Sequence, residues 1–197
     1  NKISADIILG INVLAHQPDL HGFVEGLKLA LSEQGIIIME FPYIMDLIDN
    51  VEFDTIYHEH YNYFSLAFLT RLFKEHNLKI FDVDKIPQHG GSLRIYVRHD
   101  NPDQMYPKEN HYKIFKMIEK EIHRHTYLHY NSFQFRMDFA KRDLMNFLLS
   151  NSPLHTVNVI AYGAAAKASV LFNYCGITPD LIPYVVDKSP HKQGKYT

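Results

Sequence analysis

Short apolar runs alternate with amphipathic segments in the first part of the chain. Residues 5–11 are apolar and rich in β-branched side chains, which predicts a strand buried on both faces of a parallel sheet. Asp19 is a suitable N-cap for the helix that follows, because apolar residues then recur at helical spacing, and Gly35 stands where a left-handed C-cap would end that helix. Residues 35–41 form a second apolar run that stops at Pro42, so the predicted order is strand, helix, strand.

The alternation continues through the next segment. Residues 43–51 can form another helix, and residues 52–64 have neither a helical nor a strand period, which predicts a long loop. Ser65 is the expected N-cap of an amphipathic helix that runs through His76, with its apolar positions on one face.

Two strands then follow each other closely. They are predicted at residues 78–86 and 92–99, and the short Gly-rich connector between them indicates an antiparallel hairpin. Most doubly wound sheets continue as parallel units to the end, whereas an antiparallel hairpin resembles the ending of a class I methyltransferase sheet. The predicted fold class is therefore α/β, with residues 1–100 as the C-terminal half of such a Rossmann-like sheet.

The second half of the chain predicts helices and then the start of another α/β unit. Residues 99–109 contain two prolines and are typical of a linker, and residues 110–150 are helical in pattern, with a break expected at Asn131-Ser132. A strand, a helix and a strand are expected at 156–161, 163–175 and 181–186. Residues 101–197 are thus predicted to be a helical linker followed by a partial, second Rossmann-like domain.

Composition excludes several classes of protein. With 46% hydrophobic and 21% charged residues the chain has the profile of a packed globular protein, and 20 basic against 22 acidic residues give no electrostatic footprint for nucleic acid or an anionic membrane. Cys175 is the only cysteine, so no internal disulfide or Cys-rich zinc site is possible within these residues. No signal-peptide pattern or run of eighteen apolar residues occurs, and a cytoplasmic location is expected. Thirteen histidines are the unusual feature.

The densest chemistry lies in the predicted loop, in the motif Phe53-Asp54-Thr55-Ile56-Tyr57-His58-Glu59-His60. Histidine is the side chain best suited to proton transfer at neutral pH, and two histidines flank a carboxylate here. If the segment is extended, Tyr57 and Glu59 point one way while His58 and His60 point the other. Two alternatives are a solvated loop without a role and a metal site that uses His58 and His60 as an H-x-H pair, for which no second motif supplies ligands.

Two further candidates follow strands. His16 comes after the first strand, and in open α/β sheets ligands bind outside the carboxyl ends of the strands. The sequence His89-Gly90-Gly91-Ser92 would let the backbone approach a ligand closely, but by itself it favours a simple hairpin turn.

A third candidate opens the helix of the second α/β unit. Gly163 follows a predicted strand, as a phosphate-binding turn requires, but Ala165 replaces the glycine that lets the backbone reach a pyrophosphate. Asp187 ends the next strand, where an NAD site places the acid that binds the ribose. NAD binding and a small-residue helix start built for close packing both remain open.

Together these residues resemble a known family, the S-adenosylmethionine-dependent C-methyltransferases that act on nucleotide-linked keto-deoxysugars. The resemblance covers nearly the whole chain and depends on the order and spacing of six motifs, which are Asn12-Val13-Leu14-Ala15-His16, Glu40-Phe41-Pro42-Tyr43, the loop motif at 53–60, His89-Gly90-Gly91-Ser92-Leu93-Arg94, Tyr162-Gly163-Ala164-Ala165-Ala166-Lys167 and Tyr184-Val185-Val186-Asp187.

The resemblance also has consequences for domain content. Members of the family have an N-terminal zinc-binding domain, a central methyltransferase domain and a C-terminal Rossmann-like domain. The resemblance implies that this chain is the last part of such an enzyme, without the zinc module and the first half of the cofactor site, and that these residues alone are inactive.

The resemblance further implies a mechanism. A carbon next to the sugar ketone loses a proton, and the enolate attacks the methyl group of S-adenosylmethionine. His60 would be the base, Tyr57 and Glu59 would position the sugar and the base, and His16 would bind the ketone or enolate oxygen. Residues on the cofactor side would be Asn12 and Val13, and those facing the nucleotide-sugar would be His89, Gly91, Ser92, Gly163 and Lys167. The alternatives are an NAD-dependent enzyme that modifies nucleotide-sugars and a non-catalytic module that binds them.

Overall fold

The chain forms two compact units in the computed structural model, which describes residues 4–101, 109–124, 126–151 and 159–196. The first unit consists of residues Asn1–Asn50 and His58–His129, and the second of Val51–Tyr57 and Tyr130–Thr197. These units do not coincide with the predicted domains 1–100 and 101–197, and that division of the chain stays a prediction.

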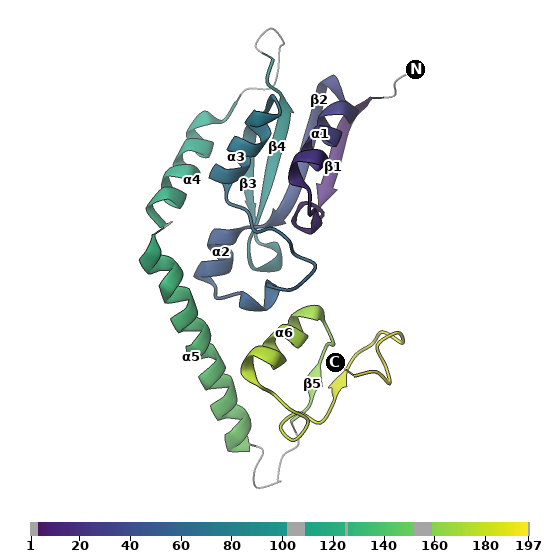
Figure 1. The fold of residues 1–197 in the computed structure, drawn as a ribbon, viewed down its shortest axis with the longest axis vertical. Helices are drawn as coiled ribbons and strands as arrows, with labels where there is room; N and C mark the ends of the chain where they lie inside the picture. The colour runs from purple at the N-terminus through teal and green to yellow at the C-terminus, as the bar shows by residue number, and fades with distance from the viewer. Residues whose placement is uncertain (1–3, 102–108, 125, 152–158, 197) are drawn as a thin grey trace. The chain divides into compact units, whose positions relative to one another are not determined.

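A four-stranded mixed sheet forms the centre of the first unit (Figure 1). Its strands are β1 (Ala5–Ile11), β2 (Leu31–Pro42), β3 (Leu78–Ile86) and β4 (Ser92–His99), and their order in the sheet is β1-β2-β4-β3. β1 and β2 are parallel, whereas β4 is antiparallel to both of its neighbours. The predicted hairpin of β3 and β4 is therefore confirmed, with β4 inserted next to β2.

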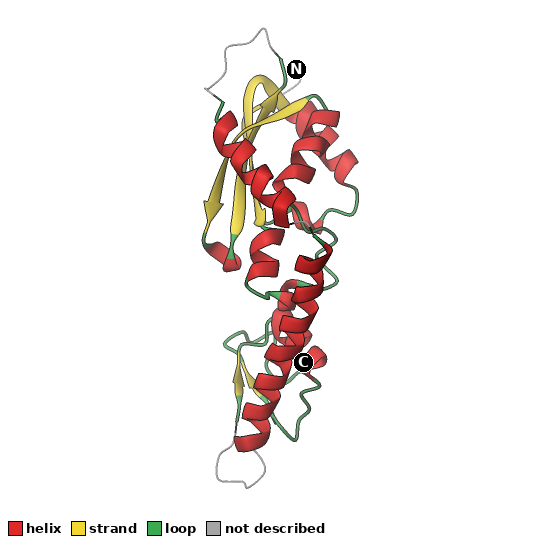
Figure 2. Cartoon of the chain, turned by 90° about the vertical axis from the view of Figure 1, so that its left-hand side faces the viewer, coloured by secondary structure: helices red, strands yellow, loops and turns green. Residues whose placement is uncertain are grey.

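Four α-helices and two short 3-10 turns accompany these strands, with three of the helices between strands and the fourth after the last strand (Figure 2). The helices are α1 (Leu20–Ala30), α2 (Ile44–Asp49), α3 (Leu66–Glu75) and α4 (His111–Arg124), and the turns are η1 (Leu14–His16) and η3 (Gln88–Gly90). The predicted caps are confirmed, since the carboxylate of Asp19 accepts a hydrogen bond from the amide of Gly22, and the hydroxyl of Ser65 accepts one from the amide of Phe68.

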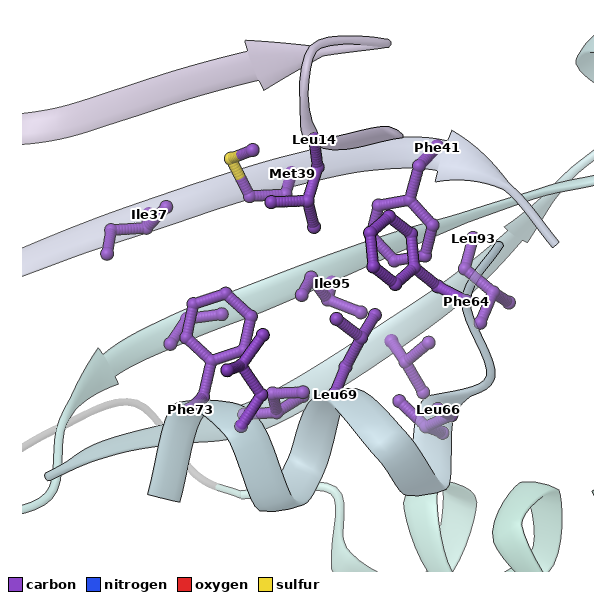
Figure 3. Close-up of a cluster of buried hydrophobic side chains, with 14 of the residues drawn as sticks. Leu14, Ile37, Met39, Phe41, Phe64, Leu66, Leu69, Phe73, Leu93 and Ile95 are labelled. Atoms are coloured by element: carbon purple, nitrogen blue, oxygen red, sulfur yellow. The ribbon is translucent and has the colours of Figure 1, made fainter. Parts of the chain in front are cut away.

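One hydrophobic core lies between the sheet and its helices. Side chains on one face of β2 and β4 meet the apolar stripe of α3 (Figure 3), and the residues at this contact are Ile37, Met39, Phe41, Leu93, Ile95, Leu66, Leu69 and Phe73, all of them buried. Helices α1 and α4 contribute further apolar side chains to the same cluster. This core supports the ends of β1 and β2, where the candidate residues lie.

The prediction that the first strand is buried on both faces is wrong for the described chain. Ile7 and Leu9 are 64% and 66% exposed, whereas Ile8 packs against the core. β1 is an edge strand with β2 as its neighbour. Burial on both faces requires covering elements on both sides, and in the described ranges only the face of Ile8 has such a cover.

The predicted role of Gly35 is also wrong. Helix α1 ends at Ala30 and passes directly into β2, so Gly35 lies within the strand. A Cβ atom at this position would lie 2.8 Å from the carbonyl oxygen of Ala5. The glycine therefore permits the close approach of two strands and does not end a helix.

The second unit contains a small βαβ element. It consists of β5 (Ala161–Tyr162), α6 (Ala166–Cys175) and β6 (Val185–Val186), and its two strands are parallel as predicted. Both strands are shorter than expected, and residues 156–158 of the first predicted strand lie outside the described residues. The turn η2 (Phe53–Thr55) packs within this unit, where the ring of Phe53 contacts that of Tyr174.

The helical segment breaks earlier than predicted. Helix α5 spans Tyr127–Asn151, so no interruption occurs at Asn131-Ser132. The hydroxyl of Thr126 accepts a hydrogen bond from the amide of His129, which makes threonine the capping residue. Most of the predicted linker, residues 102–108, lies outside the described residues. Within the described ranges, none of the helices has the length and apolar character that crossing a membrane requires.

Candidate functional site

His16 and His60 meet beside the carboxyl end of β1. Two residues separate the turn η1 from that strand, and His16 is the last residue of the turn. Two successive amides of the 58–65 segment, those of Tyr61 and Asn62, donate to the carbonyl oxygen of Ala15 at 2.9 and 3.3 Å. This backbone contact brings the two imidazole rings to 4.9 Å between centroids in an edge-on arrangement.

Further contacts hold the histidine pair. The side-chain amide of Asn62 donates to the carbonyl oxygen of Gln17 at 2.7 Å, and the ring of Tyr63 lies 6.2 Å from that of His60. Leu14 and Phe64, which flank the pair in sequence, are both buried in the core (Figure 3). The pair thus lies on a rigid base, as a group that must meet a substrate at fixed geometry requires.

Asn12 occupies the bend between β1 and η1. Its φ angle is 55°, in the left-handed region that asparagine tolerates better than most residues. The amide of Asn12 donates to the carbonyl oxygen of Glu40 at 2.8 Å, and its side-chain oxygen Oδ1 is buried but accepts no hydrogen bond from the described residues. Val13 next to it is exposed. A buried acceptor beside an exposed apolar side chain suits a bound molecule that carries hydrogen-bond donors.

An ion pair between a buried carboxylate and a partly exposed guanidinium crosses the sheet near this bend. Glu40 and Arg94 face each other in the register of β2 and β4, and the guanidinium donates to the Glu40 carboxylate through Nη2 at 2.8 Å and Nε at 3.1 Å. The hydrogen bond to Glu40 raises the pKa of Arg94 above its ordinary value, so the guanidinium remains charged. The buried Glu40 charge is therefore compensated from within the sheet.

The rest of the loop motif does not take the extended form. The chain turns at residues 58 and 59, where His58 and Glu59 form an exposed pair with 3.9 Å between Nε2 and Oε1. The alternation of side chains expected for an extended segment is therefore wrong. Tyr57 belongs to the second unit, whereas His60 belongs to the first. The structure thus joins His60 to His16, and the positioning roles of Tyr57 and Glu59 stay predictions.

The hairpin residues make contacts typical of a turn. His89 is exposed with a φ angle of 54°, and Gly91 is buried with a φ angle of 145° and accepts a hydrogen bond from the amide of Tyr43. The hydroxyl of Ser92 donates to the carbonyl oxygen of Gln88 at 3.1 Å. These contacts are sufficient to account for the three residues as part of a turn. Their role in substrate binding stays a prediction.

The candidate residues of the second unit surround Asp187. Its carboxylate accepts hydrogen bonds from the amides of Ala164 and Ser189, both at 2.8 Å. These bonds, with the nearby Lys192, hold the pKa of Asp187 below its ordinary value. The carboxylate therefore closes the turn after Gly163, and a ribose would have to compete with the backbone for it. A cavity of about 450 Å³ lies beside this turn, lined in part by Asp187 and Lys192.

Sequence reasoning missed the residues that build the histidine pair. Neither Ala15, through its carbonyl oxygen, nor Asn62 and Tyr63 belonged to the expected site. Backbone acceptors have no sequence signal, and Asn62 could have been suspected only from its position two residues after His60. The metal alternative finds no further support, because the described ranges contain no group of three or more His, Cys, Asp or Glu residues placed to hold a metal ion.

Known families cover both halves of the chain. Residues 2–83 match the model of a methyltransferase domain, and residues 87–197 match that of the C-methyltransferase C-terminal domain. The C-methyltransferase NovU of Streptomyces niveus is 31% identical over 196 residues. The match covers 97% of this chain and 45% of NovU, so the chain spans less than half the length of this relative.

Solved structures with similarity to the chain include methyltransferases. One is a chain in the complex between the Haloferax volcanii Trm112 methyltransferase activator and a methyltransferase, with a TM-score of 0.42 and 14% identity, over 50% of this chain and 56% of that chain. Another is M1.HpyAVI, with a TM-score of 0.32 and 9% identity, over 96% of this chain and 82% of that chain. Because the C-terminal family model alone matches more than half of the sequence, the chain belongs to the C-methyltransferase family that this C-terminal domain defines.

Proposed function

We propose that the protein containing this chain transfers a methyl group from S-adenosylmethionine to a carbon next to the ketone of a nucleotide-linked keto-deoxysugar. The methyltransferase domain implies the methyl donor, and the motif resemblance supports the sugar. The observation that carries the proposal is the contact of the His16 and His60 rings, 4.9 Å between centroids, beside the carboxyl end of β1.

The residues at the end of β1 fit the methyl donor. S-adenosylmethionine carries an ammonium group, ribose hydroxyls and an adenine amine, and each of these can donate to the buried Oδ1 of Asn12, which has no partner among the described residues. Val13 offers an exposed apolar contact next to it. When bound there, the donor would supply an electrophilic methyl group on a sulfonium.

Proton transfer is assigned to the histidine pair. The α-carbon and the ketone oxygen of the substrate are separated by a single carbon, so two adjacent imidazoles can address both. His60 as a neutral imidazole would accept the α-proton, and His16 would donate a hydrogen bond to the oxygen on which charge develops. Stabilising that oxygen lowers the barrier to enolate formation. Tyr57 and Glu59 would orient the sugar, and His89, Gly91, Ser92, Gly163 and Lys167 would face its nucleotide.

Replacement of the base separates catalysis from binding. In the full-length protein, His60→Ala should lower methyl transfer and the exchange of the substrate's α-proton with solvent by about 10²- to 10⁴-fold, the usual contribution of a general base. Binding of the nucleotide-sugar, measured by calorimetry, should change little. His58→Ala is the matched control, because His58 is exposed on the adjacent turn. Unchanged proton exchange in His60→Ala would exclude His60 as the base.

A further inference from the structure

Residues 60–65 form the His60 segment, which is anchored at two points. One is the carbonyl oxygen of Ala15, which accepts the amides of residues 61 and 62. The other is the start of α3, where the first two helical amides donate to the carboxylate of Glu121, that of Leu66 to Oε1 at 2.6 Å and that of Ala67 to Oε2 at 2.8 Å. Glu121 lies on α4, which also belongs to the first unit.

Glu121 is a fully buried carboxylate with three donors. It is 0% exposed, and in addition to the two helical amides it accepts a hydrogen bond from the hydroxyl of Tyr43 at 2.8 Å. Burial and the Glu121 charge raise the pKa of Tyr43, which therefore remains a donor over the physiological range. Tyr43 follows the end of β2. The carboxylate thus ties β2, α3 and α4 together at one point.

A buried charge is an expensive way to stabilise a fold. Taking a carboxylate out of water is unfavourable, and an apolar side chain of similar volume often serves stability as well or better. Helix α3 already has the hydroxyl of Ser65 as its N-cap. The positive end of the helix favours an anion at this position. A carboxylate that binds the first two helical amides also fixes where the helix starts, which is useful where that position matters for function.

We propose that Glu121 is a positioning residue for His60, an inference that rests on the proposed function of that histidine. Only residues 61–65 separate His60 from the helix start that Glu121 holds. Within this short segment Phe64 is buried and its carbonyl oxygen accepts the amide of Ile44, so a shift of the helix start is passed along the segment. A displacement of about 1 Å at a catalytic group can reduce a rate 10²-fold.

The test compares three substitutions in the full-length protein. Glu121→Gln preserves the shape and keeps one acceptor oxygen, but it removes the charge and places an amide nitrogen, which cannot accept a hydrogen bond, where the other oxygen was. We expect kcat to fall about 30-fold, with KM for the nucleotide-sugar unchanged within twofold and α-proton exchange reduced in parallel. Tyr43→Phe removes one donor and should lower kcat about three- to tenfold. Without substrate or methyl donor, amide hydrogen exchange at residues 60–67 should become faster in both variants.

Glu109→Gln is the matched control. Glu109 is a largely buried carboxylate two residues before α4, bound by Arg98, Lys79 and His111, and it makes no contact with the His60 segment among its described interactions. This variant should lose a comparable amount of thermal stability and keep kcat.

The outcomes separate this inference from the proposed function. If Glu121→Gln and Tyr43→Phe lower the unfolding temperature but leave kcat and exchange at 60–67 as in the wild type, the role of Glu121 is structural and the inference is wrong. If Glu121→Gln does not fold, Tyr43→Phe alone decides in the same way. If His60→Ala also retains full activity, the proposed function of His60 fails independently of Glu121.

Discussion

Phe64 ties the His60 segment to the core, and its replacement by leucine should loosen that segment. The ring is 1% exposed and meets Phe41 edge-on, with 5.3 Å between centroids (Figure 3). Leucine loses this aromatic pair, worth about 0.5–1.5 kcal/mol, and leaves part of the ring volume empty, which costs about another 1 kcal/mol. The free energy of unfolding of the first unit should therefore fall by about 1.5–2.5 kcal/mol.

Phe68→Leu is the control for this experiment. Phe68 also stacks on Phe64, at 6.1 Å, but it is 38% exposed, so its truncation should cost only about 0.5 kcal/mol. Hydrogen exchange of the slowest amides of β2 and β4 reports the opening of this unit without assuming that the whole protein unfolds in one step. Equal losses in the two variants would refute the argument that Phe64 is the apolar anchor of the segment.

Three further changes test the turn, the helix break and an ion pair. Gly91→Ala should lower the thermal midpoint by several degrees, because the φ angle is 145° and the added Cβ would lie 2.3 Å from a carboxylate oxygen of Asp46. Thr126→Ala removes the cap of α5 and should cost about 1 kcal/mol, seen as faster amide exchange in its first turn. Lys113 donates a hydrogen bond to Asp84 and holds the pKa of that carboxyl below its usual value. The ion pair therefore stabilises the folded state above about pH 4, and this stabilisation is lost as the pH falls through the lowered pKa. Urea denaturation at successive pH values should therefore show a gap between wild type and Asp84→Asn that is constant from about pH 5 to 8 and closes in more acidic solution.

The elements of the first unit were predictable because their signals are local. Asp19 and Ser65 cap helices as expected, and the Gly-rich connector produces the hairpin of β3 and β4. Gly35 shows where local reasoning fails. A glycine after a helical pattern fits a C-cap, but whether it caps or permits a close strand approach depends on the carbonyl oxygen of Ala5, which lies on another strand.

Burial and helix breaks depend on neighbours that a local pattern does not include. The apolar run of β1 predicts cover on both faces, whereas in the described chain Ile7 and Leu9 are exposed. Asn131-Ser132 and Thr126 are all reasonable N-caps by residue type, so the sequence alone did not distinguish them. In the structure Thr126 is the residue whose hydroxyl accepts a helical amide.

The candidate site shows the same limit at the level of chemistry. His16 could be proposed from its place after a strand and His60 from its motif, but their contact is not a property of either segment. They are 44 positions apart, and the backbone of Ala15 and the side chain of Asn62 join them. Glu121, a further 61 positions along, fixes the other end of the same segment. A motif can therefore point to a candidate base, whereas the distance between His60 and His16 is set by long-range hydrogen bonds. The substitutions at Glu121, Tyr43 and Phe64 test these long-range contacts.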